Sequence, residues 1–299
     1  MSAVEVPTAP RRGWWTEYFY EAVPLRRFDA LSALAYFVVA FTVFVSDRWA
    51  VGHADAPAGF YHPLALARLV RLPAPTPTTM LLLQLLLAAC CLAGWWRRAP
   101  RAVAAVTLAG YTTWLLWAFS FGKVDHDRLT ILVVLAVLAT TDRRGPLAPT
   151  RAGWGIRLVQ VAFAVAYPLS AMAKLRYGGV DWMNGATFTR AIVRRGTFLG
   201  EWMLHAPTLL RLSQWGFVVF ELFAVCLLLR RGTLRKLAIV GVFLLHAVTY
   251  VMITISFLPH SVFLLAFLPL EKWWPGGQVA PDEADPVVPE SARPAVSGP

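Results

Sequence analysis

Charged residues are scarce in this chain. They make up 15% of its 299 residues, whereas a soluble domain carries roughly a quarter. Acidic residues are the scarcer kind, with 17 Asp and Glu against 28 Lys and Arg. Apolar residues reach 58%, and they form long runs instead of dispersing around one core. This composition argues against an ordinary soluble fold and favours a membrane protein.

Cysteine is also rare. Three cysteines are too few for a disulfide scaffold. Cys90 and Cys91 are adjacent in one apolar run, and neighbouring side chains of a helix point about 100° apart, so these two cannot bridge without distorting it. We expect them, and Cys226 in a later run, to be small buried hydrophobic residues.

The excess of basic residues gives a net charge of +11. A nucleic-acid binder would gather such charge on one face, but here the basic residues cluster at the ends of apolar runs. Clusters of that kind anchor transmembrane helices against anionic lipid. The expected partner is therefore membrane lipid and not nucleic acid.

The apolar runs predict an all-α fold, a polytopic integral membrane helix bundle with about eight transmembrane helices. An amphipathic stretch from Trp182 to Arg195 predicts an external helix between the fifth and sixth spans. The expected spans cover residues 30–46, 79–96, 102–121, 127–141, 154–175, 207–229, 237–257 and 260–270, the last of them short or partial.

Three regions are expected along the chain. Residues 1–29 form a cytoplasmic or interfacial segment, residues 30–274 the transmembrane domain, and residues 275–299 a tail whose composition predicts disorder. No cleavable signal peptide is expected, so the first apolar run is an uncleaved span. By the positive-inside rule, both termini are expected in the cytoplasm, because basic clusters recur at residues 11–12, 97–101, 143–151 and 230–236.

Two ionisable residues fall in the middle of predicted spans, where a charge costs roughly 2.5 to 3.5 kcal/mol on insertion scales. Glu221 lies in the sixth span and His246 in the seventh. Counting about 1.5 Å per residue from the outer ends puts both at a similar depth. We therefore expect a Glu221–His246 pair across neighbouring helices, serving either helix packing or a functional site.

A second polar group collects at the outer ends of the fourth and fifth spans. Its members are His126, Asp127, Lys174, Asp181 and His260. Desolvation disfavours an ammonium group, so a lysine in apolar surroundings is more easily neutral and then acts as a base. The alternative is that the lysine extends to the headgroups without chemical role, and physical reasoning alone favours this alternative. No metal site is expected, because only residues 125–127 offer clustered ligands.

Several segments resemble the HTTM membrane family, which includes vitamin K-dependent gamma-glutamyl carboxylase and the bacterial sporulation-delaying protein B group. The resemblance covers roughly residues 25 to 270, and its motifs follow the order of the family. They are Tyr61-His-Pro63, Asp125-His-Asp127, the stretch from Tyr167 to Gly185 that includes Lys174-Leu and Trp182, Glu221, Phe243-Leu-Leu-His246 and Phe257-Leu-Pro259.

The resemblance implies a lipid- or quinol-dependent enzyme of the bacterial cytoplasmic (inner) membrane. Its outer-leaflet pocket would be built from Lys174, His126 and His246, with a reduced quinone as the only suggested cofactor. Lys174 matches the lysine that deprotonates reduced vitamin K, and His126 matches a histidine that stabilises charge there. The binding residues implied beside them are Glu221, Asp127, Trp182 and Asp181.

The sequence also departs from the carboxylase. It offers no counterpart of the lumenal domain that grips the substrate, so a processive protein carboxylase is not expected, and Asp125 stands where the carboxylase has asparagine. A second hypothesis is a non-catalytic membrane module for maturation, export or immunity of a small peptide. A small proton-coupled transporter ranks third, because the sequence shows no inverted repeat.

Overall fold

A computed structural model describes residues 13–96, 100–122 and 124–274, and within these ranges the secondary structure is helical with no strands, as predicted. The predicted features at Arg11, Arg12, Arg97 and Arg98, and the predicted tail, lie outside the described residues. Six helices are long and apolar enough to cross a membrane: Leu25–Ser46, Pro77–Trp95, Pro100–Phe119, Ala148–Gly178, Pro207–Leu228 and Thr233–Ile253. They match the first, second, third, fifth, sixth and seventh predicted spans.

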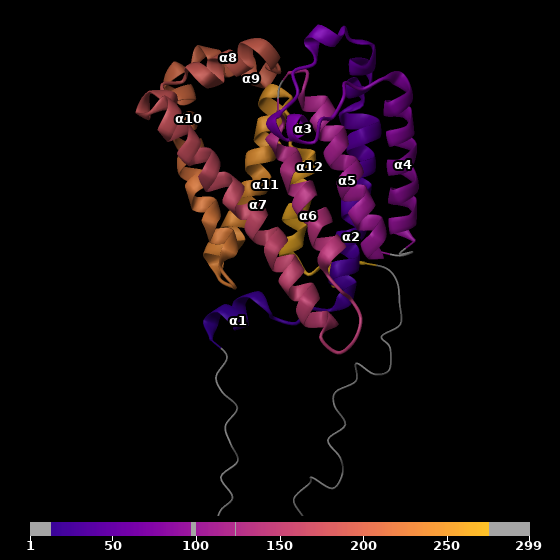
Figure 1. Cartoon of the computed structure of the whole chain (residues 1–299). Coiled ribbons are helices and arrows are strands. Elements are labelled where there is room, and N and C mark those ends of the chain that lie inside the picture. The colour runs from indigo at the N-terminus through magenta and orange to yellow at the C-terminus, as the bar shows by residue number, and fades with distance from the viewer. Residues whose placement is uncertain (1–12, 97–99, 123, 275–299) are drawn as a thin grey trace, which may run out of the picture.

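The helices run up and down along one bundle (Figure 1). The bounds of the α-helices are α1 Trp14–Phe19, α2 Leu25–Phe41, α3 Ala65–Leu69, α4 Pro77–Trp95, α5 Pro100–Phe119, α6 Leu129–Thr140, α7 Ala148–Gly178, α8 Ala186–Arg195, α9 Phe198–Trp202, α10 Pro207–Phe223, α11 Thr233–Ile253 and α12 Leu258–Ser261. A π-helical segment, η1 (Thr42–Ser46), extends α2. Two 3-10 segments, η7 (Ala224–Leu228) and η8 (Val262–Phe267), extend α10 and α12.

Proline and threonine mark where helices begin. Thr76 caps α4 with a reciprocal pair of hydrogen bonds to Thr79, and Pro77 occupies the first helical position. Proline suits that position because its missing N–H would have no partner there. Pro207 opens α10 in the same way, so these boundaries follow from local sequence.

Two predicted spans form helices that are short for a membrane crossing. Helix α6 has 12 residues, about 18 Å at 1.5 Å per residue, against a hydrocarbon core of about 30 Å. The apolar stretch Leu258–Phe267 is also in this shorter class. Both segments pack inside the bundle, where Ile131, Leu135 and Phe263 are buried.

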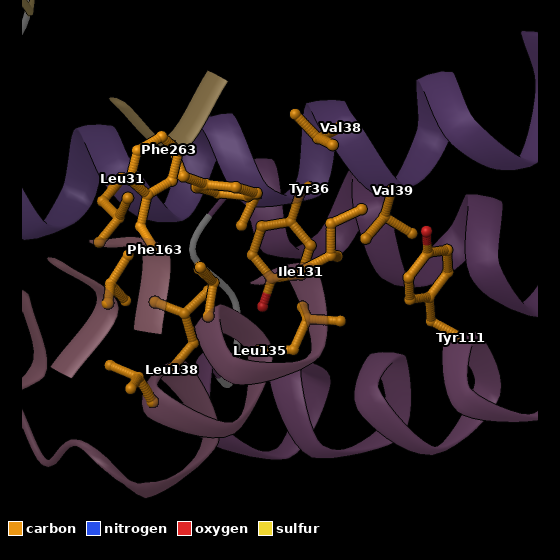
Figure 2. Close-up of a cluster of buried hydrophobic side chains, with 14 of the residues drawn as sticks. Leu31, Tyr36, Val38, Val39, Tyr111, Ile131, Leu135, Leu138, Phe163 and Phe263 are labelled. Carbon is orange, nitrogen blue, oxygen red and sulfur yellow. The ribbon is translucent and has the colours of Figure 1, made fainter. Parts of the chain in front are cut away.

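The core lies around α6. Figure 2 shows Leu31, Tyr36, Val38 and Val39 of α2, Tyr111 of α5, Ile131, Leu135 and Leu138 of α6, Phe163 of α7 and Phe263 of η8 meeting in one cluster. By contrast, α10 and α11 expose most of their apolar side chains. Helices α10 and α11 lie beside α7 on one side of the bundle, and α8 and α9 lie across one end of this pair (Figure 1). The bundle therefore has a well-packed part and a more exposed hairpin.

The predicted amphipathic helix is shorter than expected. Residues Ala186–Arg195 form α8, with Ile192 buried and Arg194 and Arg195 exposed. Trp182 belongs instead to the preceding turn η5 (Val180–Met183). The break has a local cause, because Gly185 adopts a positive φ of 96°, a conformation that glycine accepts without strain.

Gly155→Ala is expected to lower the stability of the bundle by about 1–3 kcal/mol. An added Cβ at this position of α7 would lie 2.8 Å from Val137 Cγ1 and 2.9 Å from Phe28 Cε2. Gly216→Ala on α10 is the matched control, since nothing lies within 4 Å of its added Cβ. The measurement is thermal unfolding in detergent. Equal melting temperatures for both variants would contradict the close packing of α7 against α2 and α6.

Candidate functional site

One face of α7 carries a row of polar residues. Tyr167, Ser170 and Lys174 follow one another at spacings of three and four, which places them on the same side of a helix. This side faces α10 and α11, because its side chains bond to Glu221 and His246. The site is therefore built where the exposed hairpin meets α7.

Lys174 and Glu221 form a close ion pair. The Nζ atom of Lys174 lies 2.7 Å from Oε1 and 2.8 Å from Oε2 of Glu221, and it donates to Ser170 Oγ at 2.6 Å. The side chain of Glu221 is 5% exposed and that of Lys174 18% exposed. Two rings complete the surroundings, with the centroids of Trp182 and Phe217 at 5.4 and 5.3 Å from Nζ. The charge of Lys174 is thus met by a carboxylate and two aromatic faces.

The ammonium of Lys174 points into the bundle toward Glu221 and Ser170. The alternative in which this lysine extends to the headgroups does not fit that orientation, and its role as a base stays a prediction. A nearby full negative charge outweighs the gain from reaching water when the donor sits one turn from the helix end.

His246 does not pair with Glu221, and that prediction was also wrong. The Nε2 atom of His246 lies 2.7 Å from Tyr167 Oη, while Glu221 bonds to Lys174. Two residues can lie at the same depth in a bundle and still point in different directions, because each helix can be rotated about its own axis. The stronger attraction between two full charges then selects Lys174 as the partner of Glu221.

Aromatic and imidazole rings extend the site along α7. The ring of His260 stacks on Phe163 with 4.3 Å between centroids, and its Nδ1 lies 2.8 Å from Thr130 Oγ1. The His246 and His260 rings are 6.0 Å apart. The polar row on α7 therefore meets two histidines within a mostly apolar interior.

The remaining predicted residues lie at different distances from this site. His126 is exposed, with its ring 6.4 Å from that of Phe257, which lies 5.3 Å from His246. Asp181 is exposed in η5 beside Trp182. Asp127 is buried and pairs with Arg128, so its carboxylate faces a cation of its own.

Arg128 is the centre of a second buried charge cluster. Its Nε and Nη2 donate to Asp47 Oδ2 at 3.0 Å and Oδ1 at 2.6 Å, and Nη2 also donates to Ser46 Oγ at 3.1 Å. The side chains of Arg128 and Asp47 are 7% and 1% exposed. With Asp127 on the same guanidinium, one cation serves two carboxylates.

Sequence reasoning missed Ser170 and Phe217 as neighbours of Lys174, Tyr167 as the partner of His246, and the stacking of His260 on Phe163. The spacing of Tyr167, Ser170 and Lys174 was a usable signal, because it marks one helix face. The partner of Arg128 left no such signal, since Asp47 is 81 residues away along the chain.

Among the described residues, no group of three or more His, Cys, Asp or Glu side chains is placed to hold a metal ion. The chemistry that the Lys174 site offers is proton exchange. An ammonium and a carboxylate at 2.7 Å can exchange a proton along their hydrogen bond.

Comparison with protein-family models, curated proteins and solved structures finds no match to this chain. The resemblance to the HTTM family therefore rests on the motifs alone. Six of the residues that carry those motifs meet in the described site: Tyr167, Ser170, Lys174, Trp182, Glu221 and His246.

Proposed function

We propose that this chain is a multi-pass membrane protein of the HTTM, vitamin K-dependent carboxylase-like family, and that the Lys174 site performs proton-transfer chemistry on a lipid or quinol. The observation that carries this proposal is the ion pair of Lys174 with Glu221 between two aromatic rings. Charges inside apolar helices are costly and usually serve a function.

The same proposal includes the finer topology. The chain crosses the bacterial cytoplasmic membrane eight times, with α6 and Leu258–Phe267 completing the six longer crossings, and both termini lie in the cytoplasm. Support comes from the alternating direction of the helices (Figure 1). It also comes from the arginines at the α1 end, among them Arg143, Arg157 and Arg230, because cytoplasmic loops carry the basic excess.

The residues around Lys174 suit a phenolic or quinol ring. Glu221 takes a proton from the ammonium, which leaves Nζ with a free lone pair. Nζ then accepts the proton of a ring hydroxyl, so Lys174 is again an ammonium beside the ring oxyanion, and Glu221 keeps the first proton until it is released to water. Trp182 and Phe217 present flat apolar faces to such a ring. Tyr167 and His246 hold a hydrogen bond one to two turns away, and His126 lies on the exposed side.

The test uses reduced menaquinone added under air to purified wild type, Lys174→Ala and the control Lys236→Ala. Lys236 is exposed at the opposite end of the bundle on α11. Wild type and Lys236→Ala are expected to speed the oxidation, followed by ultraviolet absorption, at least tenfold over buffer. Lys174→Ala is expected to fall to the rate in buffer while remaining folded. Wild type that neither binds nor oxidises the quinol would remove the catalytic role.

A non-catalytic module for a small peptide is the second candidate, and one observation favours it. Segment α8–α9 exposes large apolar residues beside its arginines, including Val193 at 73% and Phe198 at 81%, a combination suited to a peptide partner. In that case Lys174 and Glu221 only join α7 to α10. A peptide that co-purifies with wild type and is lost in Phe198→Ser would support this function.

A further inference from the structure

A cavity of about 410 Å³ lies at the end of the bundle opposite to Lys174. It is lined by the end of α1 and the segment after it, the first turn of α2, residues 153–160 of α7, the start of α11 and the residues around the end of η8. Five arginines line it: Arg27, Arg157, Arg230, Arg231 and Arg235. Arg157 and Lys174 are 17 positions apart on α7, about 25 Å along the axis. This cavity is therefore separate from the Lys174 site.

The carboxylates near these arginines do not balance them. The ion pairs among the described residues bring in Glu17, Glu21 and Glu271, and every separation is between 3.5 and 3.8 Å. Elsewhere in the same bundle, ion pairs close to 2.7 Å at Lys174 and 2.6 Å at Arg128. Five guanidinium groups thus face three loosely held carboxylates, which leaves an excess of positive charge around the cavity.

Two of the arginines also keep buried donors without a hydrogen bond. The Nε atoms of Arg27 and Arg235 are buried and make no hydrogen bond. The Nε atom of Arg27 faces Glu271 Oε2 at 3.8 Å, which is too long for a hydrogen bond. Nη2 of Arg27 donates to the main-chain carbonyl of Ala266, and Nη1 and Nη2 of Arg235 donate to those of Arg230 and Phe267. Buried polar atoms in native proteins nearly all have hydrogen-bond partners, and leaving one without a partner is unfavourable. An anion with several oxygens would satisfy both atoms and neutralise the excess charge.

Aromatic residues indicate the depth of this end of the bundle. Trp14 and Trp15 of α1 are 73% and 53% exposed, and Tyr20 of the same segment stacks on Trp154 of α7. Exposed tryptophans next to apolar helices are typical of the interface between lipid and water. The cavity therefore opens at the level where phosphate groups of lipids are found.

We propose that the arginine-lined cavity between α1, α7 and α11 binds a phosphate group. Guanidinium groups match phosphate by paired hydrogen bonds, and oxygens of one tetrahedral group reach several arginines at once. The group is supplied either by the headgroup of an anionic phospholipid or by free phosphate. In both cases the contacts of the arginines are the same.

Binding is measured on the purified full chain in neutral detergent, in two arms. One arm uses equilibrium dialysis with labelled inorganic phosphate at constant ionic strength. The other counts phospholipid phosphorus retained after micelles with phosphatidylglycerol are exchanged for detergent alone. Saturable binding of about one phosphate per chain in either arm is expected. A positive lipid arm alone identifies the headgroup, and a positive dialysis arm alone identifies free phosphate.

The double variant Arg27→Gln with Arg235→Gln is expected to bind at least tenfold more weakly, because both positions lose charge-assisted hydrogen bonds to the phosphate. Arg235→Lys keeps the charge but lacks Nε, so it tests the site if the double variant fails to fold, and it is also expected to bind more weakly. Arg190→Gln on the exposed face of α8 is the control and should bind as wild type. The proposal is overturned if neither arm saturates or if Arg235→Lys binds as tightly as wild type.

Discussion

Lys174→Met is expected to destabilise the bundle by roughly 3 kcal/mol, whereas Lys174→Met combined with Glu221→Gln should recover most of that loss. The single variant leaves the carboxylate of Glu221, 5% exposed, without its cation. Breaking a buried pair on one side costs about 3–5 kcal/mol, and a neutral replacement of both partners costs much less. The lower end applies because the side chain of Lys174 is 18% exposed.

This first prediction is checked by thermal unfolding in detergent of wild type, both single variants, the double variant and Lys236→Met. The exposed control should melt with wild type. A double variant as unstable as the sum of its two single variants would contradict a coupled pair. The double variant also separates stability from chemistry, because it should be folded yet inactive toward a quinol.

Arg128→Met is expected to have the largest effect on stability in the chain, about 4 kcal/mol or more. The variant leaves Asp47 and Asp127 buried near each other without a cation, so an unpaired charge and like-charge repulsion add together. Arg128→Lys keeps the charge but loses the two-point contact with Asp47, and its loss should be intermediate.

The second prediction is checked by the yield of monodisperse protein in size-exclusion chromatography and by its melting temperature. Arg48→Met in η2 (Arg48–Asp55) is the control, because Arg48 is exposed next to Asp47 in sequence. The expected order from most to least stable is Arg48→Met, Arg128→Lys, Arg128→Met. A wild-type melting temperature for Arg128→Met would show that the cluster contributes nothing.

The long helices were predictable because apolar runs and proline positions act locally. Six predicted spans match helices of sufficient length, with boundaries a few residues away. The sequence also marked Lys174 and Glu221 as charged residues in or at the end of predicted spans, where a charge is costly. Their pairing was not predictable, since it depends on how α7 and α10 are rotated about their axes.

The partners of the buried charged residues were likewise not predictable from the sequence. Asp127 was chosen from its place in a motif, but its neighbour Arg128 and the distant Asp47 determine its environment. Side-chain contacts between segments 81 residues apart leave no periodic signal in one sequence. Local sequence patterns therefore predicted the helices, whereas tertiary packing determines which buried charged residues pair.

The Lys174–Glu221 pair also determines when the site can be completed during synthesis of the chain. Its two residues are separated by 47 positions, so at about 5–20 residues per second the ribosome needs roughly 2 to 9 s to add Glu221 after Lys174. During that interval Ser170, one turn back on the same helix, is the partner already made. Lys174 lies four residues from the end of α7. Its ion pair with Glu221 can form only after α10 has been made, so the synthesis of α10 is the event that completes the site.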